Sequence, residues 1–260
     1  MVEKIIVLGF EQDIYLPDEF PGMYHFLSII AYRRQRQLQK CEDHADQRRL
    51  QFAQSSRWNE AQETAQSTSF IDSEKQQASG INAFAKALRD FYTIASYLQL
   101  LPCPNRPFST EPLRYELRMK PFLGLQPLEV PSFEEFQDDI QPYGPYAEPE
   151  AAFFDDLKNG ESELWTDIDA AIKTAKNAFG QTKKYGAGNS KAGGVAQAWE
   201  KEIQGLLASC IALSLAVTGL KRAAQKIEAG QKATVTLELP EANQRKRYVE
   251  GWVVPKVIEH

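Results

Sequence analysis

Few residues in this 260-residue chain have the types and spacing that could carry out chemistry. Cys41 and His44 lie three positions apart in a segment with helical spacing, so thiol and imidazole could meet on one helix face as a nucleophile–base pair or as two metal ligands. The more ordinary interpretation is a cysteine on an apolar stripe beside a surface histidine, because no third ligand lies nearby. The three cysteines are widely spaced without a Cys-x-x-Cys pair, which is typical of reduced thiols in a cytoplasmic protein.

A second candidate is the segment Lys183-Lys184-Tyr185-Gly186-Ala187-Gly188. It approaches the Gln/Arg-x-x-Gly-x-Gly/Ala loop with which acetyltransferases of the GNAT class hold the pyrophosphate of coenzyme A on backbone amides at a helix N-terminus. However, its first residue is lysine, the segment before it has helical rather than strand character, and the next helix starts only after a further Ser-Lys-Ala-Gly-Gly. A flexible interhelical loop over residues 180–194 is therefore the preferred interpretation, and we expect no cofactor.

Basic residues gather in the first long helical segment, at Arg33, Arg34 and Arg36 and again at residues 48–49. If these side chains share a face, they could contact a phosphate backbone, and Arg33, Arg34 and Arg36 are the candidates for a surface that faces the ribosome. The net charge of −5 gives no support for nucleic-acid binding through bulk charge. A solvated helix face is the simpler alternative.

Apolar residues recur at helical spacing in several segments, which predicts an all-α protein. The first helix is expected to begin after a cap at Asp18, with Pro21 in its first turn, and to continue to about residue 66, with a break near residues 67–69. Its outer part is polar and is expected to project from the core. A second helix over residues 81–101 would complete an antiparallel hairpin with it.

The third and fourth helices are predicted from Ser162 to Phe179 and from Val195 to Ala229, with Gly230 ending the last. The apolar centre of the fourth helix, Leu206 to Val217, is expected to be buried on all sides. Its 12 residues fall short of the roughly 20 that span a bilayer, so we expect no membrane partner.

Between the helix pairs, residues 112–136 carry four prolines and many large apolar side chains. Because proline disfavours helix at and before its own position, this stretch predicts an extended strap packed against the helices. The predicted organisation is one packed unit with four parts: a helical hairpin (1–104), the strap (105–148), a second helical pair (149–230) and an extended C-terminal tail (231–260). The predicted fold class is thus all-α, a bundle of long helices with a proline-rich strap and a short extended tail.

The strap residues Leu113-Arg114-Tyr115-Glu116-Leu117-Arg118, followed by Pro121-Phe122, resemble the C-terminal part of the large auxiliary subunit of the N-terminal acetyltransferase C complex, NatC. The start LGFEQDIYLPDEFPGMYHFLSIIAYRR is also similar to that family, in which an apolar helix ends at Gly-Phe-Glu and a long aromatic-rich helix follows. The family's subunit is much longer, so the resemblance implies that this chain corresponds to its C-terminal portion. The apolar residues 5–10 would then be the first to lack a covering partner.

The resemblance implies a cytoplasmic, non-catalytic helical scaffold that wraps a catalytic GNAT-type subunit and holds a small Sm-like subunit. It implies further that the complex acetylates nascent chains beginning with Met and a bulky apolar residue, using acetyl-CoA, at the ribosome. Structural or inter-subunit contacts are then expected for Arg114, Tyr115, Glu116, Arg118 and Phe122.

Two other hypotheses are kept alongside this one. The chain could be a helical adaptor of another complex, with the strap as a docking segment. It could also be an acetyl-CoA-binding enzyme in its own right that uses the Gly186 segment.

Overall fold

The computed structural model describes residues 2–11, 15, 17–55, 57–98, 100, 163–187, 193–228, 235–239 and 252–259. Long helices dominate these residues, and a two-stranded antiparallel ribbon completes them, so the predicted all-α class is confirmed. The predicted strap at 105–148 lies outside the described residues. The elements are α1 (Val2–Glu11), the 3-10 helix η1 (Pro17–Glu19), α2 (Phe20–Gln54), α3 (Trp58–Tyr97), α7 (Glu163–Ala187), α8 (Gly193–Glu228), β1 (Val235–Glu238) and β2 (Lys256–Glu259).

Helices α2 and α3 form the predicted antiparallel hairpin, but the turn lies at residues 55–57, not at 67–69. Ser55 ends α2 by donating its amide and hydroxyl hydrogens to the carbonyl of Gln51 at 3.1 and 2.9 Å. The Arg57 amide then donates to the Phe52 carbonyl at 2.9 Å, and its guanidinium lies over the Phe52 ring. Local side chains therefore close a turn that contains neither glycine nor proline.

The start of α2 differs from the expected cap. Glu19, not Asp18, is the N-cap residue, and it makes no side-chain capping hydrogen bond. Pro21 does lie in the first turn, as predicted, where a missing backbone N–H costs no helical hydrogen bond.

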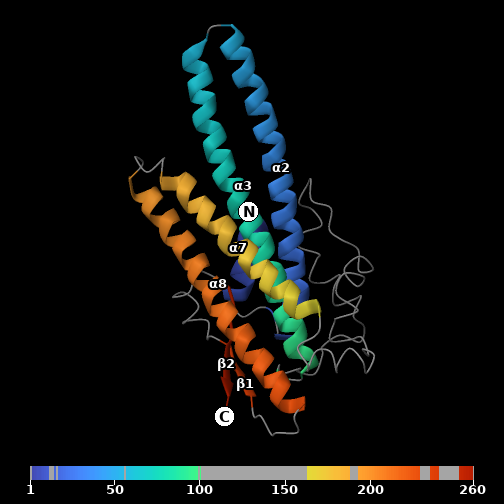
Figure 1. Ribbon diagram of the computed structural model, residues 1–260. Coiled ribbons are helices and arrows are strands. Elements are labelled where there is room, and N and C mark those ends of the chain that lie inside the picture. The colour runs from blue at the N-terminus through green and yellow to red at the C-terminus, as the bar shows by residue number, and fades with distance from the viewer. Residues whose placement is uncertain are drawn as a thin grey trace.

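The outer halves of α2 and α3 form a two-helix arm, defined here as residues 34–78, most of which extends beyond α7 and α8 (Figure 1). The projection of α2 is thus confirmed, although α3 accompanies it along the whole arm. The buried residues of α3 in the arm are mostly small or polar: Ala61, Thr68, Ser73, Gln77 and Ala78. Such a seam buries little apolar area, so the arm depends on polar pairs between the helices more than the body does.

The body stacks α3, α7 and α8 as successive layers (Figure 1). One face of α7 is buried through Trp165, Ile168, Ile172 and Phe179, as expected from the helical spacing of its apolar residues. Phe179 packs directly over Gly80 of α3, where an added Cβ would lie within 2.9 Å of three ring carbons. A glycine at this crossing lets the two helices approach closely.

Helix α7 does not end at Phe179. It continues through Gly180 to Ala187, so the loop predicted from residue 180 is wrong over residues 180–187. Gly180 faces open space with no atom within 4 Å of a Cβ position, so no close packing requires a glycine at this position. Residues 188–192 lie outside the described residues.

Helix α8 and the terminal ribbon close the body. The strands pair antiparallel with Leu237 opposite Val257, a pairing that the sequence did not indicate. Val257 packs on Gly219 of α8, with its Cβ 3.0 Å from the position that an added glycine Cβ would take. The C-terminal segment is thereby attached to the outermost helix.

Helix α1 contributes to the core, because Ile6 and Phe10 are buried against α2 while Leu8 is half-exposed. The expectation that residues 5–10 lack a covering partner is wrong for Ile6 and Phe10.

Candidate functional site

The residues predicted for inter-subunit contacts, Arg114, Tyr115, Glu116, Arg118 and Phe122, lie outside the described residues. Their role stays a prediction. The arginines proposed to face the ribosome all lie on α2, where the arm leaves the body.

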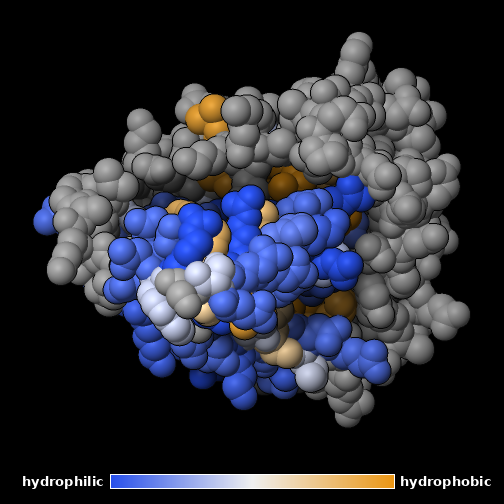
Figure 2. Space-filling model, turned by 90° about the horizontal axis from the view of Figure 1, so that it is seen from above, coloured by the Kyte–Doolittle hydropathy of each residue, from blue (hydrophilic) through white to orange (hydrophobic). Residues whose placement is uncertain are grey.

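These arginines occupy two sides of the helix. Arg34 pairs with Glu74 of α3 and so helps to hold the hairpin together. Arg36 is exposed, and Arg33, three positions before it, is half-buried on a neighbouring part of the surface. Seen from above, the described surface around the arm is mostly hydrophilic (Figure 2). The outward basic charge at this point therefore comes from Arg33 and Arg36.

A second polar group bridges the arm further out, between Glu42 of α2 and Lys75 and Asp72 of α3. The hydrogen bond from Lys75 lowers the pKa of the Glu42 carboxyl below its usual 4.5, against the effect of partial burial. Burial raises the pKa of Asp72, and the neighbouring Glu42 raises it further. The pKa of Lys75 is raised although burial acts to lower it, because hydrogen bonds to Glu42 and Asp72 favour the ammonium form. This cluster is a structural clamp of the arm.

The candidates for chemistry are not assembled into a site. Cys41 and His44 are both exposed on the arm. Across the described parts of the chain, no group of three or more His, Cys, Asp or Glu residues could hold a metal ion. Gly186 lies in the last turn of α7, so the segment before it is helix and not the strand that a coenzyme A loop requires.

The most elaborate contact among the described residues holds the C-terminal segment against the hairpin; we call Tyr24, Tyr92 and Val253 the tyrosine clasp. The Val253 amide donates to the Tyr24 hydroxyl at 3.1 Å, and the Tyr92 hydroxyl donates to the Val253 carbonyl at 2.8 Å. All three residues are completely buried. Both polar groups of one extended residue are thus satisfied by side chains from two helices, as in peptide recognition.

Aromatic rings surround the clasp. The Trp252 ring stacks on Tyr24 with centroids 6.0 Å apart and packs against Phe84 at 4.9 Å. Tyr24 and Tyr92 stack on each other at 5.9 Å, and Phe10 stacks on Tyr24 at 4.5 Å. The C-terminal segment is therefore part of the aromatic core.

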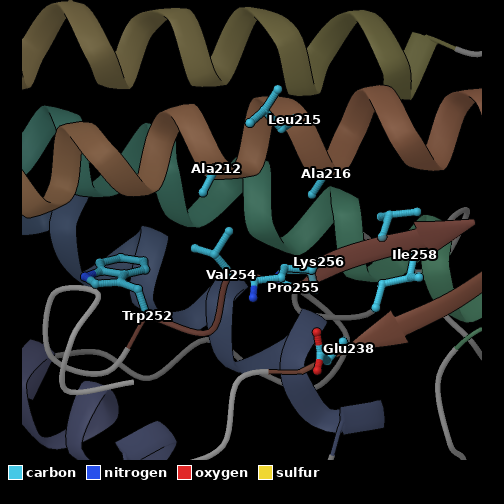
Figure 3. A pocket seen from close by; sticks show the side chains of 10 residues that line it. Ala212, Leu215, Ala216, Glu238, Trp252, Val254, Pro255, Lys256 and Ile258 are labelled. Carbon is cyan, nitrogen blue, oxygen red and sulfur yellow. The ribbon is translucent and has the colours of Figure 1, made fainter. Parts of the chain in front are cut away.

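Beyond the clasp, an apolar groove of about 410 Å³ opens between α8 and the C-terminal segment (Figure 3). Ala212 and Ala216 of α8 face Val254 and Pro255 across it, and Glu238 and Lys256 supply its charged groups. Its remaining lining residues are Leu215, Trp252, Val257 and Ile258. A groove of this composition suits apolar side chains of a partner and lacks groups placed for catalysis.

The groove continues onto an exposed apolar face of α8. Ile211 and Leu215 are 53% and 70% exposed, so the prediction that residues 206–217 are buried on all sides is wrong. The opposite face carries Leu206, Cys210 and Leu213 in the core, which accounts for the apolar composition. By length and composition alone, Gln197–Lys226 is apolar enough to span a membrane. The core helix of a globular protein meets the same criterion, and 44% of the most apolar window of Gln197–Lys226 is buried in the body.

The sequence contains a signal for this exposed face of α8. Gln204, Thr218 and Arg222 share the spacing of Ile211 and Leu215, and polar residues on both flanks of an apolar stripe indicate a surface. The tyrosine clasp had no such local signal, because its partners are 161 and 229 positions apart.

Comparison with known proteins gives a consistent result. Residues 1–241 match the family described as NAA35-like, TPR repeats. The whole chain superposes on 40% of a chain in the crystal structure of the apo NatC complex, with a TM-score of 0.77 and 17% identity. The NatC complex bound to Arl3 peptide and CoA gives 0.78 and 17%, and the complex bound to Gag peptide and CoA gives 0.76 and 18%, each over 39% of the matching chain. No curated protein matches the sequence. The likeness to these structures is one of fold, and the chain spans about two-fifths of the length of the chains that it matches.

Proposed function

Because the chain belongs to the NAA35-like family of TPR-repeat proteins, we propose that it is a non-catalytic scaffold subunit of a NatC-type N-terminal acetyltransferase complex. The observation that carries the proposal is the agreement between the family match over residues 1–241 and a fold that superposes in full on part of a NatC-complex chain. Repeat proteins of this kind present extended surfaces to partners, which is the task of a scaffold.

The described residues support a binding role. Their polar clusters are paired within the fold, as in the Arg34–Glu74 and Glu42–Lys75 contacts of the arm. The surface that these residues leave open to a partner is instead the apolar groove beside α8. The enzyme hypothesis loses its main support, since Gly186 lies in a helix.

The finer part of the proposal comes from the family resemblance. The chain would hold a catalytic GNAT-type subunit and a small Sm-like subunit in the cytoplasm. Five strap residues would be among the contacts: Arg114, Tyr115, Glu116, Arg118 and Phe122. The assembled complex would acetylate nascent chains that begin with Met and a bulky apolar residue.

Co-expression tests the proposal. The full chain is produced together with the GNAT-type and Sm-like candidates of the same organism, and gel filtration is followed by acetyl transfer to a peptide beginning Met-Leu. We expect co-elution of both subunits and activity only in fractions that contain the GNAT-type subunit. Phe122→Glu should reduce co-elution, whereas Phe70→Glu, at an exposed side chain of the arm, should retain it.

Two results would contradict the proposal. The first is elution of the chain free of both subunits. The second is acetyl transfer by the purified chain alone that is abolished by Gly186→Glu, which would restore the enzyme hypothesis.

The ribosome-facing surface has a separate test. Reversal of Arg33, Arg34 and Arg36 to Glu is expected to weaken ribosome co-sedimentation at low salt, because fewer phosphates would be neutralised. Since Arg34 also pairs with Glu74, a variant that reverses only Arg33 and Arg36 separates surface charge from arm stability. Lys173→Glu, at an exposed position of α7, is the control. Unchanged co-sedimentation of the double variant would remove the ribosome-facing assignment.

A further inference from the structure

The segment held by the tyrosine clasp has no regular secondary structure of its own. Residues 252–255 belong to neither a helix nor a strand, although Trp252, Val253 and Pro255 are buried. Pro255 favours an extended backbone at the residue before it, Val254. The backbone N–H and C=O of Val253 are bonded by the two tyrosine hydroxyls and not by a neighbouring strand. The surface of the helices therefore fixes the conformation of this segment, as it does for a bound peptide.

The receiving site on the helices is held in shape by contacts of its own. Phe10 of α1 stacks on Tyr24 with ring centroids 4.5 Å apart, and Phe20 of α2 packs edge-on against Tyr92 at 5.0 Å. Tyr24 and Tyr92 stack with centroids 5.9 Å apart and an angle of 7° between their planes. Aromatic rings of α1, α2 and α3 thus position both hydroxyls. A site that is preorganised in this way loses little conformational entropy when it binds an extended peptide.

The site recognises both the backbone and the side chains of the segment. The hydroxyls bond only the backbone of Val253, at 3.1 and 2.8 Å, so they set the register of the segment without selecting a side chain. Selection comes from the buried side chains. Trp252 packs on the rings of Tyr24 and Phe84, and the side chain of Val253 is completely buried beside it. The matching ligand is an extended peptide in which an aromatic residue precedes a β-branched one.

We propose that α2 and α3 carry a binding site for such a peptide, that residues 252–255 fill it as an internal ligand, and that a segment of the same chemistry from a partner protein can take their place. The inference concerns a site that the proposed scaffold function does not use. It stands or falls without that function, because it can be tested on this chain alone.

The short connection from Glu238 of β1 to Trp252 sets the terms of the competition. A short tether holds the segment near its site at an effective concentration on the order of 1 mM. A free peptide of equal affinity therefore displaces only about a tenth of the docked segment at about 0.1 mM. A partner that is already bound elsewhere on the chain presents its own segment at a comparable effective concentration, so it competes on equal terms.

Cutting the tether in the folded chain tests the proposal. The recognition sequence of a site-specific protease is inserted after Gln244, and circular dichroism checks that the uncut chain folds like the unsubstituted one. After cleavage, the C-terminal piece should co-elute with the body in gel filtration. A fluorescent synthetic peptide of residues 245–260 should then exchange into the site, which raises its fluorescence anisotropy. The uncut chain should take up far less of the same peptide.

Variants of the peptide show what the site recognises. Trp252→Ala should raise the dissociation constant at least about tenfold, because it removes the buried ring. Val253→Pro should do the same, because proline has no N–H to donate to the Tyr24 hydroxyl. Ile258→Ala is the matched control, since Ile258 is 36% exposed, and it should leave the constant unchanged within about twofold.

Variants of the body test the hydroxyls. Tyr24→Phe and Tyr92→Phe should each weaken binding of the peptide at least about fivefold, because each leaves a buried backbone group of Val253 without its partner. Tyr32→Phe, at an exposed position of α2, should not change it.

Release of the C-terminal piece on cleavage would overturn the proposal, because the site would then have no affinity of its own. So would loss of helical circular dichroism on cleavage, since the helices would then depend on the segment as part of their core. Absence of exchange, or equal binding of the Trp252→Ala peptide, would overturn it as well. If the chain with the insertion does not fold, the intact Trp252→Ala chain replaces it. Its own segment lacks the aromatic anchor, so it should bind the peptide more tightly than the unsubstituted chain does, and equal binding would refute the proposal.

Discussion

Removing the two hydroxyls of the tyrosine clasp is expected to destabilise the protein through its C-terminal segment. Tyr24→Phe deprives the Val253 amide of its acceptor, and Tyr92→Phe deprives the Val253 carbonyl of its donor. Each substitution keeps the stacked ring. The perturbation is therefore the loss of hydrogen bonding by the hydroxyl group and not of packing.

The structure sets the magnitude. Val253 and both tyrosines are completely buried, so water does not reach the backbone group that is left without its partner. A buried polar group that loses its partner costs about 1–3 kcal/mol in the free energy of unfolding. The two bonds act on one residue, so we expect the double variant to cost less than the sum, with a coupling free energy of about 0.5–3 kcal/mol.

Urea unfolding followed by circular dichroism measures these free energies. Tyr32→Phe is the control, because Tyr32 lies on the same helix and is 48% exposed; its free energy of unfolding should stay within about 0.5 kcal/mol of the unsubstituted chain. Cleavage by chymotrypsin after Trp252 is a second readout and should accelerate in the clasp variants alone. If both clasp variants behave like Tyr32→Phe, the C-terminal segment is not held by these hydroxyls.

Two further predictions concern helix packing and the arm. Gly80→Ala should lower the free energy of unfolding by about 1–3 kcal/mol, because the added methyl group meets the buried ring of Phe179. Gly180→Ala, where the added methyl group meets open space, should raise the free energy of unfolding by about 0.5–1 kcal/mol. Urea unfolding measures both, and equal effects would refute the close crossing of the two helices. Glu42→Gln should destabilise the chain by at most about 1 kcal/mol at pH 7, and this difference should vanish as the pH falls below 4.5. The sign follows because bonding to Lys75 lowers the pKa of Glu42 in the folded state, so its contribution is present above the usual pKa and is lost on protonation; a difference that grows in acid would contradict it.

Local periodicity predicted the helices well where one face meets a core. Tyr24, Leu27 and Ala31, which follow helical spacing in the first long helix, are buried, and α8 ends two residues before Gly230. Such patterns depend only on spacing within one element, so they can be read from the sequence. The tail over residues 231–260 was likewise predicted to be extended, and its described part contains the strands β1 and β2.

The helix boundaries that were predicted wrongly lie where local residue types are a poor guide to where a helix ends. The hairpin turn at residues 55–57 has no strong helix breaker, and its hydrogen bonds form only once the chain has reversed direction. Conversely, the loop predicted over residues 180–194 includes Gly180 and Gly186, but α7 continues through both. A glycine in a helix costs about 1 kcal/mol, which is a bias that neighbouring helical residues outweigh.

Exposure and long-range contact could not be predicted from the pattern of one element. The sequence of α8 is apolar around most of its circumference, and only the arrangement of layers determines that Leu215 faces outward while Leu213 faces the core. The clasp joins helices near the start of the chain to a segment near its end. For both features the information lies in which elements pack together.

The clasp and the apolar groove beside α8 are physically linked. Val253 is fixed by the two tyrosines, while its neighbours Trp252 and Val254 line the groove beside α8. Without the docked C-terminal segment, α8 would present a bare helix face in place of a groove with two walls. Any interaction that holds this segment in its docked position therefore shapes the groove. Because coupling between two sites is reciprocal, a partner bound in the groove stabilises the docked segment by the same free energy by which docking favours binding of that partner. A scaffold built in this way joins its own fold stability to the occupancy of its outer surface.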